Sequence, residues 1–208
     1  MPIKTSRTSP LQIAEVHLGK EEGRLGLTLC PGKKDPAYHW DRDLRTDVKA
    51  IRAWGASTVV TLIEPHEFQL LAIETLEQEV RSHGMDWWHL PIRDVDVPDA
   101  LFEEAWEAAG TELHGRLDAG DRILIHCRGG LGRTGLVAGR ILVERGCDPR
   151  TAIHRVRAVR PHAIETAAQE RYVLAGKARA IDTPEETASR TVRAQGLEGA
   201  PLTSGPHS

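Results

Sequence analysis

The apolar residues of this chain fall into two kinds of segment that alternate along the sequence. Short apolar runs bounded by turn residues are typical of buried strands, and they occupy residues 25–29, 58–63, 87–92 and 122–126. Longer segments with apolar residues every three or four positions are typical of helices, and they occupy residues 43–54, 68–83, 101–117, 133–145, 149–159 and 163–178. Strands that alternate with helices predict an α/β fold, with a mostly parallel central sheet and helices on both faces.

Both ends of the chain lack this alternation. Residues 1–19 open with a polar segment that holds two prolines, and they are predicted to form an N-terminal arm. Residues 181–208 are rich in Pro, Gly, Ser, Thr and Glu, which predicts a disordered C-terminal tail. Residues 20–180 are therefore expected to form one folded domain, and a length of 208 residues suits one domain with tails.

The composition narrows the classes of function. A formal net charge of −3 creates no broad basic field, so neither nucleic acid nor an anionic membrane is expected as a partner. Three cysteines, at positions 30, 127 and 147, are too few for a disulfide framework and suit a reducing compartment. Residues 1–10 lack the apolar core of a signal peptide, and no apolar stretch approaches the ~20 residues of a membrane helix. These features predict a soluble, cytoplasmic protein.

A glycine-rich turn joins the strand at 122–126 to the following helix, and it reads His126-Cys127-Arg128-Gly129-Gly130-Leu131-Gly132-Arg133-Thr134. In such sheets, ligands bind at the carboxyl ends of the strands. The glycines let the backbone curl with its amides inward, and the helix N-terminus adds positive potential at the same point. The loop is therefore predicted to bind a dianion such as a phosphate ester.

Two side chains of this loop have complementary chemistry. Thiols at helix N-termini ionise more readily than free thiols, so Cys127 is expected to be a thiolate nucleophile. Arg133 lies six residues later, and its planar fork is expected to hold two phosphate oxygens. Thr134 is expected to donate a hydrogen bond to the sulfur, and His126 to brace the loop through backbone carbonyls. The alternative, a structural cysteine at a strand end, leaves this combination of residues unexplained.

Phosphoryl transfer of this kind also needs an acid that protonates the leaving oxygen. The segment Pro91–Asp99 follows a predicted strand and precedes a predicted helix, which places it at the same sheet edge as Cys127. Asp94 is the first carboxylate after the strand and is the preferred acid, with Asp96 as the alternative. Asp99 is better explained as a helix N-cap. Taken alone, the segment also fits a polar surface loop.

These residues resemble the dual-specificity branch of the protein tyrosine phosphatases, whose signature is His-Cys, five residues, Arg, and Thr or Ser. The closer resemblance is to the cyclin-dependent-kinase-associated phosphatase family, including its bacterial relatives. It rests on Gly26–Gly32 as the first strand, Pro91–Asp99 as the acid loop, His126–Thr134 as the catalytic loop and, less closely, Ala163–Gln169. The resemblance covers residues 20–178 and implies a phosphatase domain over residues 20–180.

The resemblance also implies roles for single residues. Cys127 is the nucleophile, Arg133 the phosphate clamp and Asp94 the acid, while Gln169 positions a water molecule. Glu165 stands where the family carries another glutamine. The substrate phosphate is expected to lie against Arg128, Gly129, Gly130, Leu131, Gly132 and Thr134. No metal or other cofactor is expected, because the loop itself supplies the positive field.

The expected function is hydrolysis of phosphotyrosine, phosphoserine or phosphothreonine in phosphorylated proteins, through a cysteinyl-phosphate. A non-protein ester, such as a phosphoinositide, an inositol phosphate or an RNA end, is one alternative substrate. A non-catalytic phosphate-binding module is the other alternative. Cys30 is expected to be a buried small residue, or else a disulfide partner that protects Cys127. Arg155, Arg157 and Arg160 fit a solvated helix face or a docking site for an acidic phosphoprotein.

Overall fold

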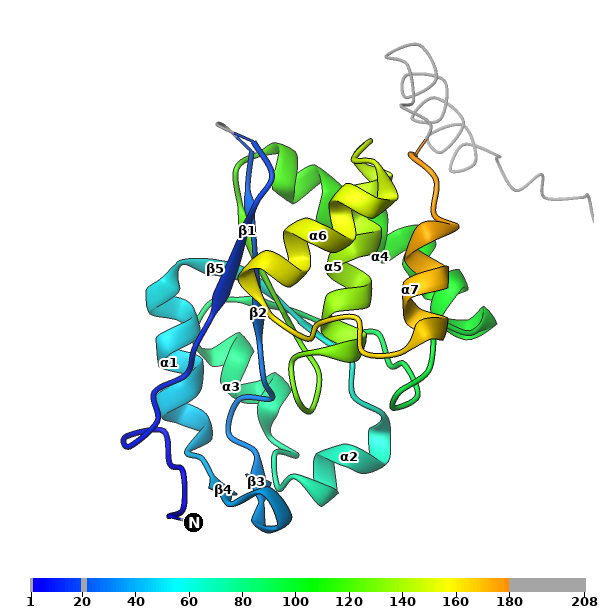
Figure 1. Ribbon diagram of the computed structural model, residues 1–208. Coiled ribbons are helices and arrows are strands. Elements are labelled where there is room, and N and C mark those ends of the chain that lie inside the picture. Colours follow the sequence, from blue (N-terminus) through cyan, green and yellow to red (C-terminus); the bar gives the residue numbers. More distant parts are fainter. Residues whose placement is uncertain (1, 20–21, 180–208) are drawn as a thin grey trace, which may run out of the picture. The chain divides into compact units, whose positions relative to one another are not determined.

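Five strands form one central sheet in the computed structural model, which describes residues 2–19 and 22–179 (Figure 1). The strands lie in the order β1-β2-β7-β5-β6, with the bounds Ala14–His17 (β1), Arg24–Thr28 (β2), Ala56–Thr61 (β5), Asp86–His89 (β6) and Arg122–His126 (β7). Strands β2, β7, β5 and β6 run parallel, and β1 pairs with β2 in the antiparallel sense. The predicted mostly parallel sheet is confirmed.

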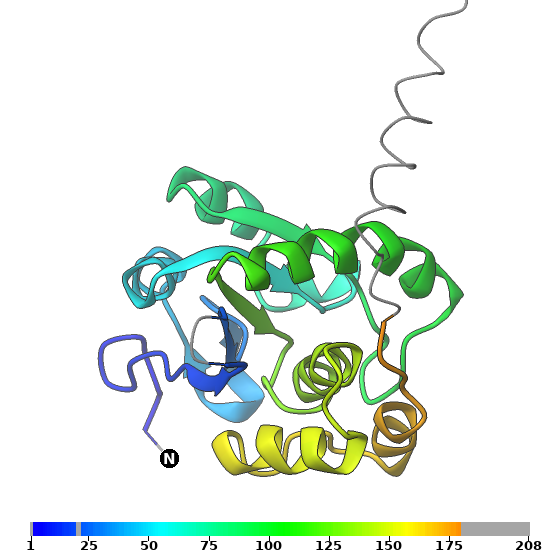
Figure 2. The same cartoon turned by 90° about the horizontal axis from the view of Figure 1, so that it is seen from above.

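Helices cover both faces of the sheet, as the alternating pattern predicts (Figure 2). One face carries α1 (Leu44–Trp54), α3 (Leu76–Ser82) and α4 (Ala100–Asp118). The other face carries α5 (Gly132–Glu144), α6 (Pro149–Val159) and α7 (Ala167–Leu174). The central strands are consequently buried on both sides, which is why β7 carries the continuous apolar run Ile123–Ile125 and β5 buries its threonines as well as its valines.

Three smaller elements complete the described chain. A short helix, α2 (Pro65–Leu70), follows β5. Two short strands, β3 (Lys34–Asp35) and β4 (Trp40–Asp41), form a separate hairpin around a 3-10 turn at Pro36–Tyr38. No helix within the described ranges is long and apolar enough to cross a membrane.

Side-chain caps set the ends of two predicted helices. Asp43 precedes α1, and its Oδ1 accepts a hydrogen bond from the Thr46 N–H at 2.7 Å. The same helix ends at Gly55, whose φ of 97° only glycine adopts without strain. Asp99 precedes α4 and accepts from the Phe102 N–H at 2.9 Å, so its predicted role as an N-cap is confirmed.

The single helix predicted at residues 68–83 is wrong, because the segment contains two helices, α2 and α3, separated by a turn. At this turn Ala72 has a left-handed φ of 53°. Leu71 and Ile73 on either side are both buried. Residues two positions apart point to different sides of a helix, so burial of both favours a turn over a continuous helix here.

The helix predicted at residues 163–178 is shorter in the structure and begins only at α7. A capping box sets this start: Gln169 N–H donates to Thr166 Oγ1 at 3.1 Å, and Thr166 N–H donates to Gln169 Oε1 at 3.3 Å. The residues before the box pack closely on α5. A Cβ at Gly135 would lie 2.8 Å from the Cβ of Ala163, so glycine is needed at this contact.

The described part of the predicted N-terminal arm is packed on the domain and is not a loose segment. Strand β1 lies within residues 1–19 and pairs with β2. Lys4 forms an isolated bridge with Trp40, and Ser6 Oγ accepts from the Asp43 N–H at 2.9 Å. The four residues of β1 are too short an apolar pattern for recognition, and pairing with a neighbouring strand makes them extended. The predicted tail, 181–208, lies outside the described residues.

Candidate active site

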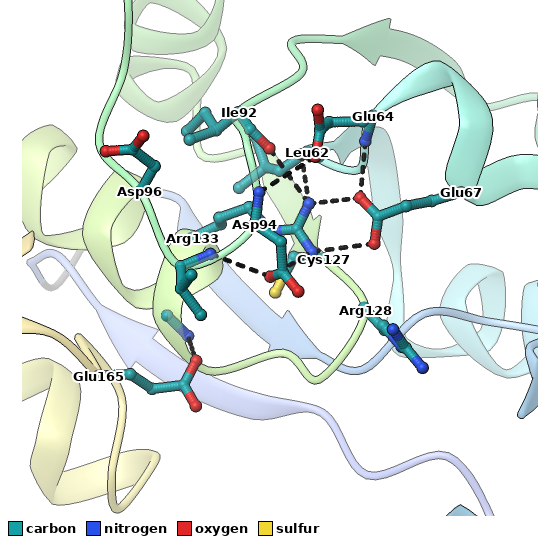
Figure 3. A network of polar contacts seen from close by, with 12 residues as sticks. Leu62, Glu64, Glu67, Ile92, Asp94, Asp96, Cys127, Arg128, Arg133 and Glu165 are labelled. Atoms are coloured by element: carbon teal, nitrogen blue, oxygen red, sulfur yellow. Dashed lines mark hydrogen bonds and ion pairs between the residues drawn. The ribbon is translucent and has the colours of Figure 1, made fainter. Parts of the chain in front are cut away.

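Four segments that follow parallel strands meet at one edge of the sheet (Figure 3). They comprise residues 29–33 after β2, 62–67 after β5, 90–99 after β6 and 127–132 after β7. Parallel strands all end at the same edge, so the topology brings these distant segments together. The predicted nucleophile, clamp and acid all lie here, as the sequence indicates.

Cys127 is the first residue after β7, and only 3% of it is exposed. Its Sγ accepts a hydrogen bond from the Gly130 N–H at 3.3 Å. The sulfur therefore lies inside the loop, beside a backbone N–H and next to the start of α5.

The three loop glycines differ in whether backbone conformation or lack of space requires glycine at the position. Gly130 has a φ of 71°, and a Cβ there would lie 2.3 Å from the carbonyl oxygen of Thr28, so both conformation and space require glycine. A Cβ at Gly132 would lie 2.5 Å from the Glu165 carboxylate, which instead accepts the Gly132 N–H at 2.7 Å. Gly129 has neither constraint. Conformation and space therefore account for Gly130, close contact with Glu165 accounts for Gly132, and the part of Gly129 in curling the loop stays a prediction.

Arg133 is 1% exposed and is held by a carboxylate that the sequence did not point to. Its Nη1 lies 2.6 Å from Glu67 Oε2, and its Nη2 lies 3.1 Å from Glu67 Oε1, which is a two-point fork. Burial alone lowers the pKa of Arg133, but the hydrogen bonds that it donates to Glu67 raise the pKa above its ordinary value. Its buried Nε has no hydrogen-bond partner in the described structure. The guanidinium is thus fixed, with one donor uncommitted.

Asp94 reaches the same guanidinium from the loop after β6 (Figure 3). Its Oδ1 lies 2.8 Å from Arg133 Nη2, and its side chain is 53% exposed. The backbone N–H of Asp94 donates to Glu64 Oε2 at 3.1 Å, which ties this loop to the start of α2. The preferred acid therefore lies beside the clamp, at the border between the buried loop and solvent.

Asp96 lies two residues further on and is oriented differently. Its Oδ1 accepts from the neighbouring Val97 N–H at 2.8 Å, so the carboxylate stabilises a local turn. Its carbonyl accepts from Gln169 Nε2 at 3.0 Å. Gln169 is fully buried, and its Oε1 accepts from the Glu165 N–H at 3.0 Å. The side-chain amide of Gln169 thus braces the acid loop, and this orientation does not favour its predicted role of positioning water.

The role predicted for Thr134 needs correction, and His126 also links two strands. His126 Nε2 is hydrogen-bonded to Thr61 Oγ1 at 2.8 Å, so it ties β7 to β5, and the backbone of Cys127 is among the groups that act on its ring. Burial lowers the pKa of His126 to about 3, which keeps the ring neutral. Thr134 Oγ1 is buried without a hydrogen-bond partner in the described residues, so it does not donate to the Cys127 sulfur here.

Arg128 belongs to the loop but faces the β3–β4 hairpin. Its Nε and Nη2 donate to Asp35 Oδ2 at 3.1 and 3.0 Å, and its guanidinium lies 5.6 Å from the ring centre of Tyr38. Leu131 is also predicted at the site. Its carbonyl accepts a hydrogen bond from the Gly135 N–H at 2.8 Å, at the start of α5. Both side chains border the loop, and the charge of Arg128 is partly neutralised by Asp35.

Three charged side chains at this edge were missed or misread in the sequence: Glu67, Lys33 and Arg160. Glu67 carries a signal in retrospect, because Glu64-Pro65-His66-Glu67 is a helix-start pattern that places Glu67 after a strand end. No sequence pattern points to Lys33, because lysines are rarely buried. Arg160 was assigned to a solvated face or a docking site, yet it bonds the carbonyls of Gly129 and Gly130.

Cys30 is fully buried below the loop, and burial raises the pKa of its thiol. Its backbone N–H donates to the Arg128 carbonyl at 3.3 Å. Cys30, Cys127 and Cys147 are all free thiols. The expectation of a buried small residue is confirmed for Cys30.

The chain is similar to known proteins in sequence and in fold. The chain matches the model of a family described as "Swiss Army Knife protein, DSP-PTPase phosphatase domain" over residues 40–173. It is 30% identical to cyclin-dependent kinase inhibitor 3 of Mus musculus over 176 residues, which cover 83% of this chain and 81% of that protein. Phosphatidylglycerophosphate phosphatase PTPMT1 of Arabidopsis thaliana is 31% identical over 130 residues, which cover 62% of this chain and 36% of that protein.

A crystal structure of kinase associated phosphatase, with its catalytic-site cysteine substituted by serine, has a similar fold. It aligns with a TM-score of 0.70 at 27% identity, over 79% of this chain and 93% of that chain. The active form of Tk-PTP aligns with a TM-score of 0.58 at 25% identity, over 77% of this chain and 93% of that chain. The family match over residues 40–173 includes the loop after β7, and the structural similarity extends over more than three quarters of the chain.

Proposed function

This chain belongs to the DSP-PTPase phosphatase family, and from that premise we propose that it hydrolyses phosphate monoesters of proteins through a cysteinyl-phosphate. One observation carries the proposal: a buried cysteine, a fixed arginine and a half-exposed aspartate converge at one sheet edge. Binding alone needs no nucleophile, so this combination favours catalysis over a non-catalytic phosphate-binding module.

In the first step the Cys127 thiolate attacks phosphorus, an S–P bond forms and the bond to the leaving oxygen breaks. Asp94 gives its proton to that oxygen, so the product leaves as an alcohol or phenol. The unpartnered Nε of Arg133, with the loop amides, is suited to bind the equatorial oxygens as charge shifts. Glu67 keeps the guanidinium in place during the step.

In the second step a water molecule attacks the cysteinyl-phosphate. Asp94, now a carboxylate, takes a proton from that water, the S–P bond breaks and inorganic phosphate leaves with the thiolate restored. The loop amides and Arg133 stabilise the same oxygens again. Gln169 contributes indirectly, because its side chain fixes the acid loop through the Asp96 carbonyl.

The charge balance around the loop supports a substrate with a single phosphate. Asp35 neutralises Arg128, and Glu67 neutralises Arg133. Esters with several phosphates need several cationic side chains that have no acidic partner. The described residues around the loop after β7 offer few of these. The similarity to cyclin-dependent kinase inhibitor 3 also supports a phosphorylated protein as substrate.

A second candidate function is hydrolysis of a phospholipid-type monoester. It is favoured by the similarity to phosphatidylglycerophosphate phosphatase PTPMT1, which covers 62% of this chain. A cytoplasmic location suits the first candidate, and three free cysteines fit such a reducing compartment.

The proposal is tested with the purified protein, an aryl phosphate and EDTA. We expect turnover that survives chelation and is blocked by vanadate, because the loop and Arg133 supply the positive field. The variant Cys127→Ser is expected to bind vanadate or tungstate yet to lose turnover, and Cys147→Ser serves as the control. More than trace hydrolysis by Cys127→Ser would contradict the covalent route.

The substrate class is tested by comparing kcat/KM for phosphotyrosine and phosphothreonine peptides with that for phosphatidylglycerophosphate in mixed micelles. We expect the peptides to be the better substrates. A clear preference for the lipid would replace the first candidate with the second.

A further inference from the structure

The carbonyl groups of three consecutive loop residues accept hydrogen bonds from two cations that belong to different segments of the chain. Lys33 comes from the segment after β2, and Arg160 from the end of α6. Lys33 reaches the carbonyl of Arg128, and Arg160 reaches the carbonyls of Gly129 and Gly130. The cations thus contact the backbone of the loop from outside.

Lys33 is a buried lysine whose hydrogen bond goes to the backbone. It is 5% exposed, and its Nζ donates to the Arg128 carbonyl at 3.1 Å. Its ammonium also lies 5.2 Å from the ring centre of Trp40. Burial lowers the pKa of Lys33, so keeping a charge here costs stability. An apolar side chain would avoid that cost, which indicates a role beyond packing.

Arg160 spans two peptide groups. Its Nε donates to the Gly130 carbonyl at 3.0 Å, and its Nη2 donates to the Gly129 carbonyl at 3.2 Å. Burial lowers the pKa of Arg160 as well. Bonds from a charged donor to a neutral acceptor are about twice as strong as those between neutral groups. A single guanidinium therefore fixes the orientation of two neighbouring peptides.

Peptide planarity converts these outer contacts into an inner geometry. In a trans peptide the carbonyl of one residue and the N–H of the next point in opposite directions. When the carbonyls of Arg128, Gly129 and Gly130 point toward the cations, the N–H groups of the three following residues point inward. The Gly130 N–H does so, since it donates to Cys127 Sγ at 3.3 Å.

We propose that Lys33 and Arg160 are positioning residues that hold the loop after β7 in its anion-binding conformation. The inference rests on the proposed phosphatase function for the identity of the anion, a phosphate or its analogue. It assigns no contact between either side chain and substrate. Their positive charges lie behind the carbonyls, and the Gly130 N–H, which belongs to one of the peptides that they orient, donates to Cys127 Sγ.

The test measures anion binding separately from turnover. Tungstate affinity is determined by calorimetry in a Cys127→Ser background for Arg160→Met, Arg160→Lys and Lys33→Met. Loss of charged hydrogen bonds is expected to weaken binding about tenfold or more in both methionine variants. Arg160→Lys retains the charge but loses the second donor, so an intermediate affinity is expected.

Two controls remove a positive charge without touching the loop. Lys34→Met changes an exposed neighbour of Lys33, and Arg150→Met changes an exposed position on α6. Both are expected to bind tungstate within about twofold of the background protein. Equal losses of tungstate affinity in the controls and the test variants would show that net charge alone causes the loss, and this would overturn the proposal. So would unchanged binding in Arg160→Met and Lys33→Met.

A second readout uses proteins that retain Cys127. Iodoacetamide alkylates the thiolate, so its rate against pH reports how readily the thiol ionises. The curve is expected to move to higher pH in both methionine variants, and an unmoved curve with normal tungstate affinity contradicts the proposal. If Arg160→Met does not fold, the test depends on Arg160→Lys. Tungstate affinity and alkylation rates equal to those of the parent in this variant would overturn the proposed role of Arg160. A parent protein that binds tungstate but hydrolyses no ester would refute the proposed function, while the positioning roles would stand.

Discussion

Asp94 and Asp96 are two residues apart, but their surroundings give them different chemistry. Both carboxylates accept a hydrogen bond from the N–H of the next residue, at 3.1 Å for Asp94 and 2.8 Å for Asp96. Asp94 is half exposed and in addition lies 2.8 Å from Arg133, beside the phosphate clamp. At the scale of single residues, this contrast supports Asp94 as the acid.

The variant Asp94→Asn is expected to lose roughly 10²–10⁴-fold in kcat on phosphoserine peptides, because alkyl leaving groups need a proton. Activated aryl phosphates should suffer least. Asp96→Asn is the matched control and should remain near parent activity. The measurement is a leaving-group series with pH profiles for both variants. A large loss in Asp96→Asn together with a small one in Asp94→Asn would exchange the two assignments.

Arg133 shares one guanidinium between Glu67 and Asp94 while its Nε stays unpartnered. Lysine retains the charge but has no planar fork, so it cannot satisfy Glu67 and bind phosphate in the same geometry. Arg133→Lys is therefore expected to reduce kcat/KM for an aryl phosphate by at least a hundredfold. A loss of less than about tenfold, or ~1.4 kcal/mol of barrier, would show that the planar guanidinium is not needed to bind Glu67 and phosphate together.

At the scale of elements, the short helix α2 supports the site from the next strand. Its Glu67 is 2% exposed and forms an ion pair with Arg133. Glu64, just before the helix, accepts a hydrogen bond from the Asp94 N–H. Burial alone raises the pKa of Glu67, but the hydrogen bond from Arg133 is among the interactions that hold it below its ordinary value. One helix start therefore fixes both the clamp and the acid loop.

The variant Glu67→Gln retains the shape but loses the charge that holds Arg133. We expect kcat/KM to fall roughly 10–100-fold with the fold retained, because a small displacement of a positioned group is costly. Glu77→Gln, on the exposed side of α3, is the control. Steady-state kinetics and circular dichroism check the outcome. Equal activity in the two variants would show that Glu67 does not position the arginine.

At the scale of the whole molecule, the central strands are tied together by a neutral histidine. His126 on β7 bonds Thr61 on β5, and burial lowers the pKa of His126 to about 3 from an ordinary 6.5. Between these values the unfolded chain binds a proton that the folded protein excludes. The folded state is therefore favoured above about pH 6.5 and loses this contribution as the pH falls.

Urea unfolding at pH 6, 5 and 4 should show this loss. For one proton, the free energy of unfolding is expected to fall by about 1.4 kcal/mol per pH unit across this window. His126→Gln should be less stable than the parent at pH 7 but should have a flatter pH dependence by that amount. His154→Gln, exposed on α6, is the control. Parallel pH curves for parent and His126→Gln would contradict the buried neutral histidine.

The sequence by itself determined the parallel sheet, the capped ends of α1 and α4, and the site around Cys127, Arg133 and Asp94. Each of these depends on short-range patterns: continuous apolar runs, cap residues and a turn between a strand and a helix. The carboxyl ends of parallel strands share an edge, so even the meeting of Asp94 with the loop follows from the order of elements.

Tertiary structure alone decided what surrounds these residues. Glu67 and Arg133 are 66 positions apart, and Lys33 and Arg128 are 95 apart, so no local period links them. Likewise, the break between α2 and α3 depends on burial of Leu71 and Ile73 against the rest of the core. A charged side chain is buried only where it has an ion-pair or hydrogen-bond partner. Packing of distant segments supplies that partner here. The chemistry of the site is therefore local in sequence, whereas its support is assembled by the fold.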